Sequence, residues 1–245
     1  MTQGKLNIAI IPAAGIGARM HSDRAKQMIE LHGVPLLVHS LRRFEDCDAI
    51  HQVILVLQPS LTTDVLGLIS RHNLTKIGRV VAGGAERQDS VYRGLQVIKE
   101  EYAGIIVVHD AARPFVRPEE IRSVVERAAN TGAALMAIPA TDTIKQMKGG
   151  RVKRTLDRKR IYQAQTPQAF KYSIIREAYE RAYADGFTAT DDSQLVERIG
   201  HRVSIVEGSP INLKITRPFD LKLAEVIRSE FFEKATSIED VSKVK

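Results

Sequence analysis

The chain has 245 residues, and its 36 lysines and arginines outnumber its 29 aspartates and glutamates, giving a formal net charge of +7 at pH 7. A single cysteine, Cys47, excludes an internal disulfide and a four-cysteine zinc site. No run approaches the roughly 20 apolar residues that a membrane span needs, and the N-terminus lacks the pattern of a secretion signal. We therefore expect a soluble, cytoplasmic protein without a membrane partner. This length allows one substantial core, so we expect a single domain at residues 1–233 and a polar tail at 234–245.

Short runs of apolar and β-branched residues alternate with segments of helical periodicity. The runs that predict strands lie at residues 6–11, 52–57, 78–83, 104–109, 133–139 and 202–208. Because they are almost uniformly apolar, we expect them to be covered on both faces. Apolar residues recur at helical spacing in the segments 37–44, 91–98, 121–128, 174–182 and 218–231, the last beginning near Pro218. This alternation predicts an α/β fold with a doubly wound, mostly parallel sheet.

Residues 143–155 interrupt the alternation. Gly149 and Gly150 lie between two short runs of alternating polar and apolar residues, which predicts a β-hairpin that projects from the domain as a β-arm. The overlapping segment 145–160 contains eight basic residues and one acid, a net charge of +7 that equals the excess of the whole chain. This concentration favours an anionic partner, and a solvated hairpin is the alternative.

The segment after the first predicted strand, "PAAGIGARM" at residues 12–20, has the features of a phosphate-binding loop. In open α/β sheets ligands bind beyond the carboxyl ends of the strands. Gly15 and Gly17 would let backbone N–H groups approach a phosphate, although neither the third glycine of the dinucleotide pattern nor a Walker motif is present. Arg19 and Lys26 follow closely, as a reacting triphosphate would require. The alternative is a tight turn with surface cations.

Two further strand ends carry candidate residues. Asp110 follows the fourth predicted strand, where one carboxylate beside a phosphate site would suit Mg²⁺; an aspartate that only caps a turn is the alternative. We expect His109 to pack or to satisfy a backbone group, because no second histidine lies at metal-ligand spacing. Ser90 lies near the start of the helix after the third strand, where a base or an anion could bind.

Seven motifs together resemble, in order and spacing, the 2-C-methyl-D-erythritol 4-phosphate cytidylyltransferases of isoprenoid biosynthesis. They are "PAAGIGARM", "GGAERQDSV", "HDAARPF", "DTIK", "QTPQAF", "TATDD" and "NLKITRPFDL", spread over residues 8–224. The resemblance implies a Rossmann-like nucleotidyltransferase whose β-arm joins two subunits into a homodimer. It also implies that CTP and methylerythritol 4-phosphate react with Mg²⁺ as cofactor and release pyrophosphate.

The resemblance also implies roles for individual residues. The nucleotide site would be formed by Ala13, Ala14, Gly15, Gly17, Gly84, Ala85, Ser90 and Ala111. Catalytic roles fall to Arg19 and Lys26 at the α-phosphate of CTP and to Arg158 and Lys214 at the attacking phosphate. The substrate would contact Asp110, Arg113, Thr143, Thr166 and Thr190, with Asp110 also binding the metal. Ala85 stands where relatives often have an acid, so only a backbone contact to the base would remain there.

Two alternative functions remain open at this point. The ribitol 5-phosphate cytidylyltransferases resemble this family closely, although the two alanines of "HDAARP" favour the methylerythritol group. A basic nucleic-acid-binding module would explain the positive charge. However, the chain has six tyrosines, seven phenylalanines, no tryptophan and no interleaved stripe of basic and aromatic residues, so we expect no nucleic-acid partner.

Overall fold

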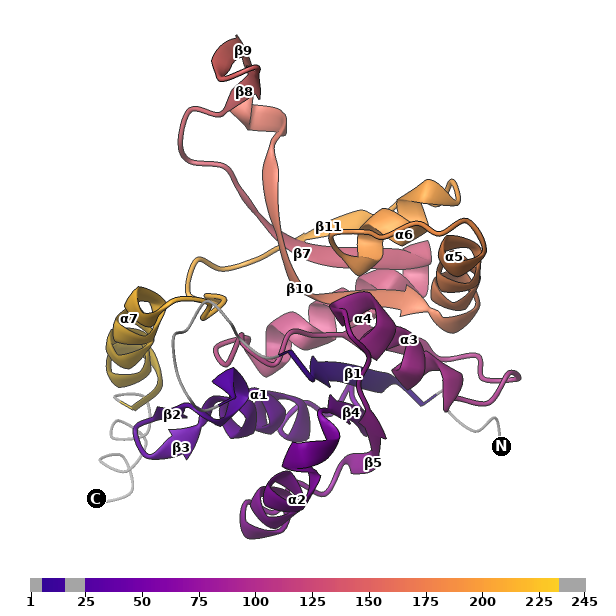
Figure 1. Cartoon of the computed structure of the whole chain (residues 1–245), viewed down its shortest axis with the longest axis vertical. Helices are drawn as coiled ribbons and strands as arrows, with labels where there is room; N and C mark the ends of the chain where they lie inside the picture. Colours follow the sequence, from indigo (N-terminus) through magenta and orange to yellow (C-terminus); the bar gives the residue numbers. More distant parts are fainter. Residues whose placement is uncertain (1–5, 16–24, 234–245) are drawn as a thin grey trace, which may run out of the picture.

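A computed structural model describes residues 6–15 and 25–233, and the centre of this part is an open sheet with the strand order β11-β7-β10-β6-β1-β4-β5 (Figure 1). In chain order the strands are β1 (Ile8–Ala13), β4 (Gln52–Leu57), β5 (Ile77–Ala82), β6 (Ile105–Val108), β7 (Ala133–Pro139), β10 (Tyr162–Lys171) and β11 (Ser204–Glu207). All neighbouring pairs are parallel except those of β10, which runs antiparallel to both β6 and β7. The predicted α/β fold with a mostly parallel sheet is confirmed.

Strand β10 was not predicted, whereas the six predicted strands are all present. Its buried part includes polar side chains, so this segment lacks the apolar run by which the other strands were predicted. Gln168 Nε2 donates to Asp191 Oδ2 at 2.9 Å, and its Oε1 accepts from the backbone N–H of Ser193 at 2.9 Å. Gln165 Nε2 donates to the carbonyl of Ser209 at 2.9 Å. These hydrogen bonds compensate the cost of burying amides, so a central strand can carry them.

The expectation that every strand is covered on both faces is wrong for β5 and β11. Both lie at an edge of the sheet, and their residues are partly or fully exposed. An edge strand has only one neighbour, so even an apolar run there remains in contact with solvent. For example, Ile205 of β11 is 46% exposed.

Helices cover both faces of the sheet. One face is packed by α1 (Leu36–Glu45), α2 (Thr62–Arg71) and α4 (Pro118–Thr131), and the other by α3 (Arg87–Gln96), α5 (Tyr172–Ala184) and α6 (Asp192–Arg198). Successive side chains of a strand point to opposite faces of the sheet, so each face has its own apolar core. In β1, Ala9 and Ile11 belong to the core on one face, while Ile8 and Ile10 belong to the core on the other. The predicted helical segments are confirmed, and α2 and α6 are additional.

A smaller cluster attaches the C-terminal helix to the domain. Helix α7 (Pro218–Arg228), which continues into the π-helical turn Ser229–Glu233, begins where the sequence predicts. It packs near a short hairpin of β2 (Glu30–Leu31) and β3 (Val34–Pro35). The buried residues of this cluster are Leu31, Leu36, Phe115, Ile215 and Ala224. The packing holds the segment before α7 against the turn after β6.

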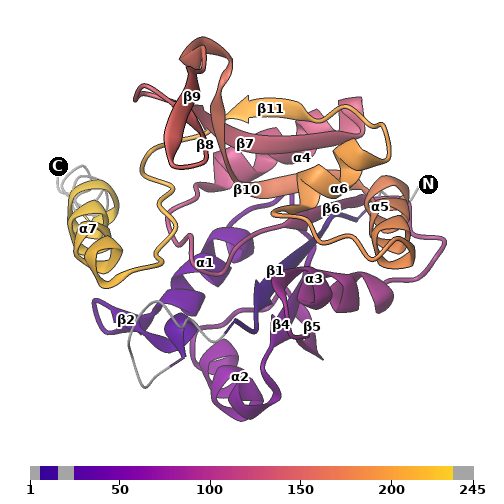
Figure 2. The same cartoon turned by 45° about the horizontal axis from the view of Figure 1, so that its top comes forward.

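The predicted β-arm is confirmed as a hairpin of β8 (Lys145–Lys148) and β9 (Arg151–Thr155), which extends away from the sheet (Figures 1 and 2). Gly149 and Gly150 have φ angles of +56° and +76°, the left-handed conformation that a tight two-residue hairpin turn requires. The short helix Arg158–Arg160 follows and leads the chain into β10.

None of the helices in the described ranges is long and apolar enough to cross a lipid bilayer. The single domain and the cytoplasmic location stay predictions. The expected tail at 234–245 lies outside the described residues.

The imidazole of His39 links α1 to α7 inside the protein. Its Nε2 lies 2.9 Å from the carbonyl oxygen of Leu31, and its Nδ1 lies 3.2 Å from Nη1 of Arg228. Since a carbonyl only accepts and a guanidinium only donates, Nε2 carries the proton and Nδ1 accepts. Burial lowers the pKa of His39; the Leu31 carbonyl opposes this shift and the nearby arginines add to it, and together these effects bring the pKa to about 4.

This environment predicts a dependence of stability on pH. Between about pH 6.5 and 4 the unfolded chain protonates His39 and the folded chain does not, so the stabilisation is complete above pH 6.5 and is lost as the pH falls toward 4. Over this window the unfolding free energy of the wild type should fall more steeply than that of His39→Gln, by up to about 1.4 kcal/mol per pH unit. Urea unfolding at several pH values measures both slopes, with the exposed His201→Gln as the matched control. Equal slopes for wild type and His39→Gln would contradict a neutral, buried His39.

Candidate active site

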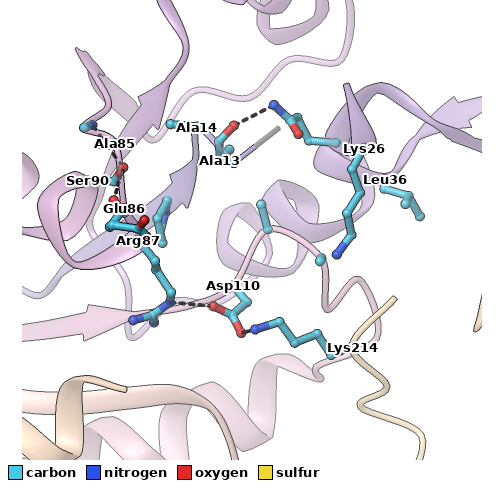
Figure 3. Close-up of a pocket in the computed structure, with 16 residues that line it drawn as sticks. Ala13, Ala14, Lys26, Leu36, Ala85, Glu86, Arg87, Ser90, Asp110 and Lys214 are labelled. Carbon is cyan, nitrogen blue, oxygen red and sulfur yellow. Dashed lines mark hydrogen bonds and ion pairs between the residues drawn. The ribbon is translucent and has the colours of Figure 1, made fainter. Parts of the chain in front are cut away.

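A cavity of about 450 Å³ opens at the carboxyl edge of the sheet, between the ends of β1 and β6 (Figure 3). From β1 the chain builds outward through β4 and β5, and then crosses to β6 on the other side of β1. This reversal is the topological switch point at which open α/β sheets bind ligands. The cavity is lined by Pro12, Ala13, Ala14, Gly15, Lys26, Gln27, Leu36, Gly84, Ala85, Glu86, Arg87, Ser90, Asp110, Ala111, Ala112 and Lys214.

Asp110 lies among three cationic side chains. Arg87 Nε lies 2.9 Å from its Oδ1, Lys214 Nζ lies 2.7 Å from Oδ2, and Arg113 Nε lies 3.7 Å from Oδ2. Arg87 and Lys214 approach the carboxylate from opposite sides (Figure 3). Burial alone would raise the pKa of this carboxyl, but Arg87, Lys214 and Arg113 hold it well below its usual range. Asp110 is therefore an anion throughout the physiological pH range.

A chain of hydrogen bonds fixes the turn that carries Asp110. The backbone N–H of Asp110 donates to Thr166 Oγ1 at 3.0 Å, and this hydroxyl lies 3.1 Å from His109 Nδ1. His109 Nε2 lies 3.0 Å from the carbonyl of Arg113, so it carries the proton, and Nδ1 accepts from the hydroxyl. Burial lowers the pKa of His109 to about 4, which keeps the ring neutral. The expectation that His109 packs and satisfies the backbone is confirmed.

Arg87 extends the ion-pair network beyond the cavity. Its Nη2 lies 2.7 Å from Oδ2 of Asp192, and Oδ1 of Asp192 accepts a hydrogen bond from the hydroxyl of Tyr179. Asp192 is completely buried. The sequence analysis did not select Arg87 or Asp192, although both lie inside quoted motifs. The available signal was an arginine at the start of the helix after the third predicted strand, which does not reveal its acidic partner.

The wall of the cavity away from Asp110 depends on the close approach of two backbone segments, one after β1 and one after β5. A Cβ on Gly83 would lie 2.1 Å from Cβ of Ala14, so a side chain there would push the two segments apart. Ser90 Oγ accepts from the N–H of Gly84 at 3.2 Å and donates to the carbonyl of Glu86 at 3.1 Å, which folds the loop before α3. At Gly15 no described atom lies within 4 Å of a Cβ position, so this glycine leaves open space.

Most of the predicted site residues line this one cavity. They are Ala13, Ala14, Gly15, Lys26, Gly84, Ala85, Ser90, Asp110, Ala111 and Lys214. Arg113 and Thr166 do not line it, but they contact Asp110 from behind, and Nη1 of Arg113 donates to the carbonyl of Asn212 at 2.7 Å. Gly17 and Arg19 lie outside the described residues.

Three predicted residues do not meet the cavity within this chain. Thr143 is exposed in the segment that leads into the arm. Arg158 is exposed at the base of the arm, where its Nη1 donates to the carbonyl of Thr141 at 2.7 Å. Thr190 is exposed ahead of α6, and its N–H and hydroxyl donate to Gln194 Oε1 at 2.8 and 3.2 Å. Within this chain the three residues therefore lie apart from the cavity.

A metal ion would find few protein ligands here. Within the described ranges no three or more histidine, cysteine, aspartate or glutamate side chains are grouped so as to hold one. Mg²⁺ bound to a nucleotide typically needs only one or two carboxylates, because phosphate oxygens and water complete its shell. Asp110 fits such a ligand, since Lys214 on its Oδ2 has a side chain that is 39% exposed and has room to turn away.

Two glycines, two lysines and a buried aspartate at the switch point of a doubly wound sheet define a protein of the class that binds nucleotides and transfers phosphate-linked groups. Comparison with known families identifies the group within this class. The profile of the 2-C-methyl-D-erythritol 4-phosphate cytidylyltransferase family (IspD) matches residues 7–230. The chain belongs to this family, as the seven motifs predict, and is a cytidylyltransferase.

Individual relatives agree over nearly the whole chain. The 2-C-methyl-D-erythritol 4-phosphate cytidylyltransferase of Syntrophus aciditrophicus is 47% identical over 220 residues, covering 89% of this chain and 94% of its own. The enzyme of the same name from Halalkalibacterium halodurans is 42% identical over 221 residues, covering 90% and 96%.

Solved structures extend the agreement to the fold. The 4-diphosphocytidyl-2C-methyl-D-erythritol synthase of Anaerococcus prevotii superposes with a TM-score of 0.82 at 29% identity, covering 93% of this chain and 97% of that one. The 2-C-methyl-D-erythritol 4-phosphate cytidylyltransferase of Thermus thermophilus superposes with a TM-score of 0.74 at 34% identity, covering 90% and 98%.

Proposed function

We propose that this enzyme transfers CMP from CTP to 2-C-methyl-D-erythritol 4-phosphate, a step of isoprenoid precursor biosynthesis by the non-mevalonate pathway. An oxygen of the methylerythritol phosphate forms a bond to the α-phosphorus of CTP. The bond from that phosphorus to the bridging oxygen breaks, and pyrophosphate leaves with the electron pair. The products are 4-diphosphocytidyl-2-C-methyl-D-erythritol and pyrophosphate. The observation that carries this proposal is the placement of Lys26, Asp110 and Lys214 around one cavity at the switch point.

The loop side of the cavity suits the nucleotide. The backbone at Gly15 can approach a phosphate closely, because no side chain blocks it. Lys26 lines the cavity next to this loop. We assign Lys26, together with Arg19, to the charge that develops on the α-phosphate and the leaving pyrophosphate. Alanine at position 85 leaves a backbone contact as the means of recognising cytosine there.

The Asp110 side of the cavity suits the phosphorylated polyol. Lys214 Nζ lies 2.7 Å from Oδ2 of Asp110. A substrate phosphate carries more charge than this carboxylate, so we assign Lys214 to the attacking phosphate once substrate is bound. Arg113 and Thr166 hold Asp110 in place, and Oδ2 then becomes available to a substrate hydroxyl or to the metal. Positioning and charge neutralisation carry out the catalysis, and no nucleophilic side chain is needed.

We propose Mg²⁺ as the cofactor and Asp110 as its protein ligand. The ion would neutralise charge on the triphosphate and orient it for attack. Asp110 stays ionised under the influence of its cationic neighbours, as a metal ligand must.

We further propose that the enzyme is a homodimer in which the arm of one subunit completes the site of the other. Three observations support this: the arm extends away from its own sheet, its basic residues are exposed, and Arg158 lies apart from the cavity of its own chain. A C2 dimer would deliver Arg158 and Thr143 twice, once to each site. Thr190 remains a predicted substrate contact that this arrangement does not explain.

The choice of substrate gives the first test. CTP with methylerythritol 4-phosphate and Mg²⁺ should release pyrophosphate faster than any other pair of nucleotide and polyol phosphate. Chelation of the metal should abolish turnover, because the charge of the triphosphate is then under-neutralised. A pyrophosphate-release assay with each pair measures this. A faster rate with ribitol 5-phosphate would assign the enzyme to that alternative substrate instead.

A subunit-mixing experiment tests the shared site. Lys26→Ala and Arg158→Ala should each be nearly inactive alone. After mixing and refolding in equal amounts, about half of the dimers are mixed and each contains one intact site, so about a quarter of the wild-type activity should return. Activity that stays at the level of the separate variants, with mixed dimers confirmed, would contradict a shared site.

The matched control mixes Lys26→Ala with Arg19→Ala. Both residues are assigned to the same chain's half of the site, so no pairing of these subunits restores an intact one. Recovery of activity in this control would show that activity can return without the arm of one subunit completing the site of the other.

A further inference from the structure

We propose that Arg87 is a positioning residue for this reaction: it joins Asp110 to the buried Asp192 and thereby holds the Asp110 carboxylate with its Oδ2 turned to the cavity. The inference rests on the proposed function. It concerns a residue to which neither the sequence motifs nor the proposed reaction assigns a role.

The geometry of the guanidinium supports this role. Arg87 Nε lies 2.9 Å from Asp110 Oδ1, and Nη2 lies 2.7 Å from Asp192 Oδ2. These nitrogens belong to one rigid planar group, so the two carboxylates are kept at a fixed separation. A lysine carries the same charge at one point only and cannot hold both acids in this way.

Asp192 provides the anchor. It is completely buried at the first turn of α6, and its second oxygen accepts from the hydroxyl of Tyr179, which is also buried. Burial and the neighbouring Asp192 raise the pKa of Tyr179 well above its usual range, so this hydroxyl stays a donor. Asp192 does not line the cavity. Its influence therefore reaches the cavity through Arg87, and this separates a positioning role from direct contact with substrate.

The consequence for Asp110 is a defined orientation. Arg87 occupies Oδ1, so Oδ2 is the oxygen that remains for Lys214, which lies 2.7 Å from it. Without Arg87 the carboxylate could rotate, and either oxygen could pair with Lys214. The backbone of Arg87 also begins α3 directly after the loop at 83–86, so the same residue ties the nucleotide side of the cavity to the Asp110 side.

The test compares Arg87→Lys, Arg87→Met and Asp192→Asn. Arg176→Met is the matched control, because Arg176 also bridges two acids, Glu100 and Glu180, and its side chain is also 30% exposed. The kcat and the KM for each substrate are measured on folded protein, with the melting temperature recorded for every variant. We expect kcat to fall about 10- to 100-fold in all three test variants, the range found for residues that orient a ligating group, with each KM changed less than threefold. Arg176→Met should keep the wild-type kcat.

The outcomes separate the explanations. If Arg87 only stabilised the fold, the melting temperatures would fall while kcat of the folded Arg87→Lys and Asp192→Asn variants stayed at the wild-type value, and this would overturn the inference. If Arg87 bound substrate directly, Arg87→Lys would raise KM and Asp192→Asn would leave kcat unchanged, which would also overturn it. Should Arg87→Met fail to fold, the two conservative variants decide. A wild-type enzyme inactive on CTP and methylerythritol 4-phosphate would instead overturn the proposed function, and the inference with it.

Discussion

The carboxylate of Asp110 is the group on which the arrangement of this site depends. Its side chain is 10% exposed, and an ion so poorly hydrated must be paired to remain charged. The three cations that pair with it come from three segments: Arg87 from the start of α3, Arg113 from the turn after β6, and Lys214 from the segment before α7. Pairing with one anion brings these segments to the switch point of the sheet.

This arrangement also prepares the cavity for anionic ligands. Arg87, Arg113 and Lys214 together carry one more charge than the two carboxylates they pair with, Asp110 and Asp192. The surplus positive charge creates a field that attracts a triphosphate and a sugar phosphate. Because ion pairs within the protein hold these cations in place, little reorganisation is required as charge develops during transfer. The buried partners Asp192 and Thr166 keep the network aligned without lining the cavity themselves.

The sequence predicts the parts of this site that depend on local pattern. Apolar runs locate the strands, and the residues just beyond them locate Gly15, Gly84 and Asp110, because parallel strands end at one edge of the sheet. The two glycines at the tip of the arm likewise predict its turn. Each of these inferences depends only on residues that are close together in the sequence.

What the sequence could not predict depends on long-range pairing. Strand β10 inserts antiparallel between β6 and β7 although it buries glutamines, and their hydrogen-bond partners Asp191, Ser193 and Ser209 lie 23 to 44 residues away in the chain. The ion pair of Arg87 and Asp192 joins residues 105 positions apart. No spacing rule selects Asp192 rather than the adjacent Asp191 as the partner. The residues Thr143 and Arg158 differ from these cases, because the site proposed for them belongs to a second subunit.

The free energy of unfolding of Asp110→Asn tests most directly whether this carboxylate holds the site together. The substitution keeps the shape of the side chain and removes the charge, which leaves three cations close to one another. Urea unfolding should show a loss of about 3 kcal/mol or more, the scale for removing one partner of a buried ion pair. The control is Asp48→Asn, which breaks the exposed pair with Arg122 and should cost less than about 1 kcal/mol. An Asp110→Asn enzyme as stable as the Asp48→Asn enzyme would contradict the account.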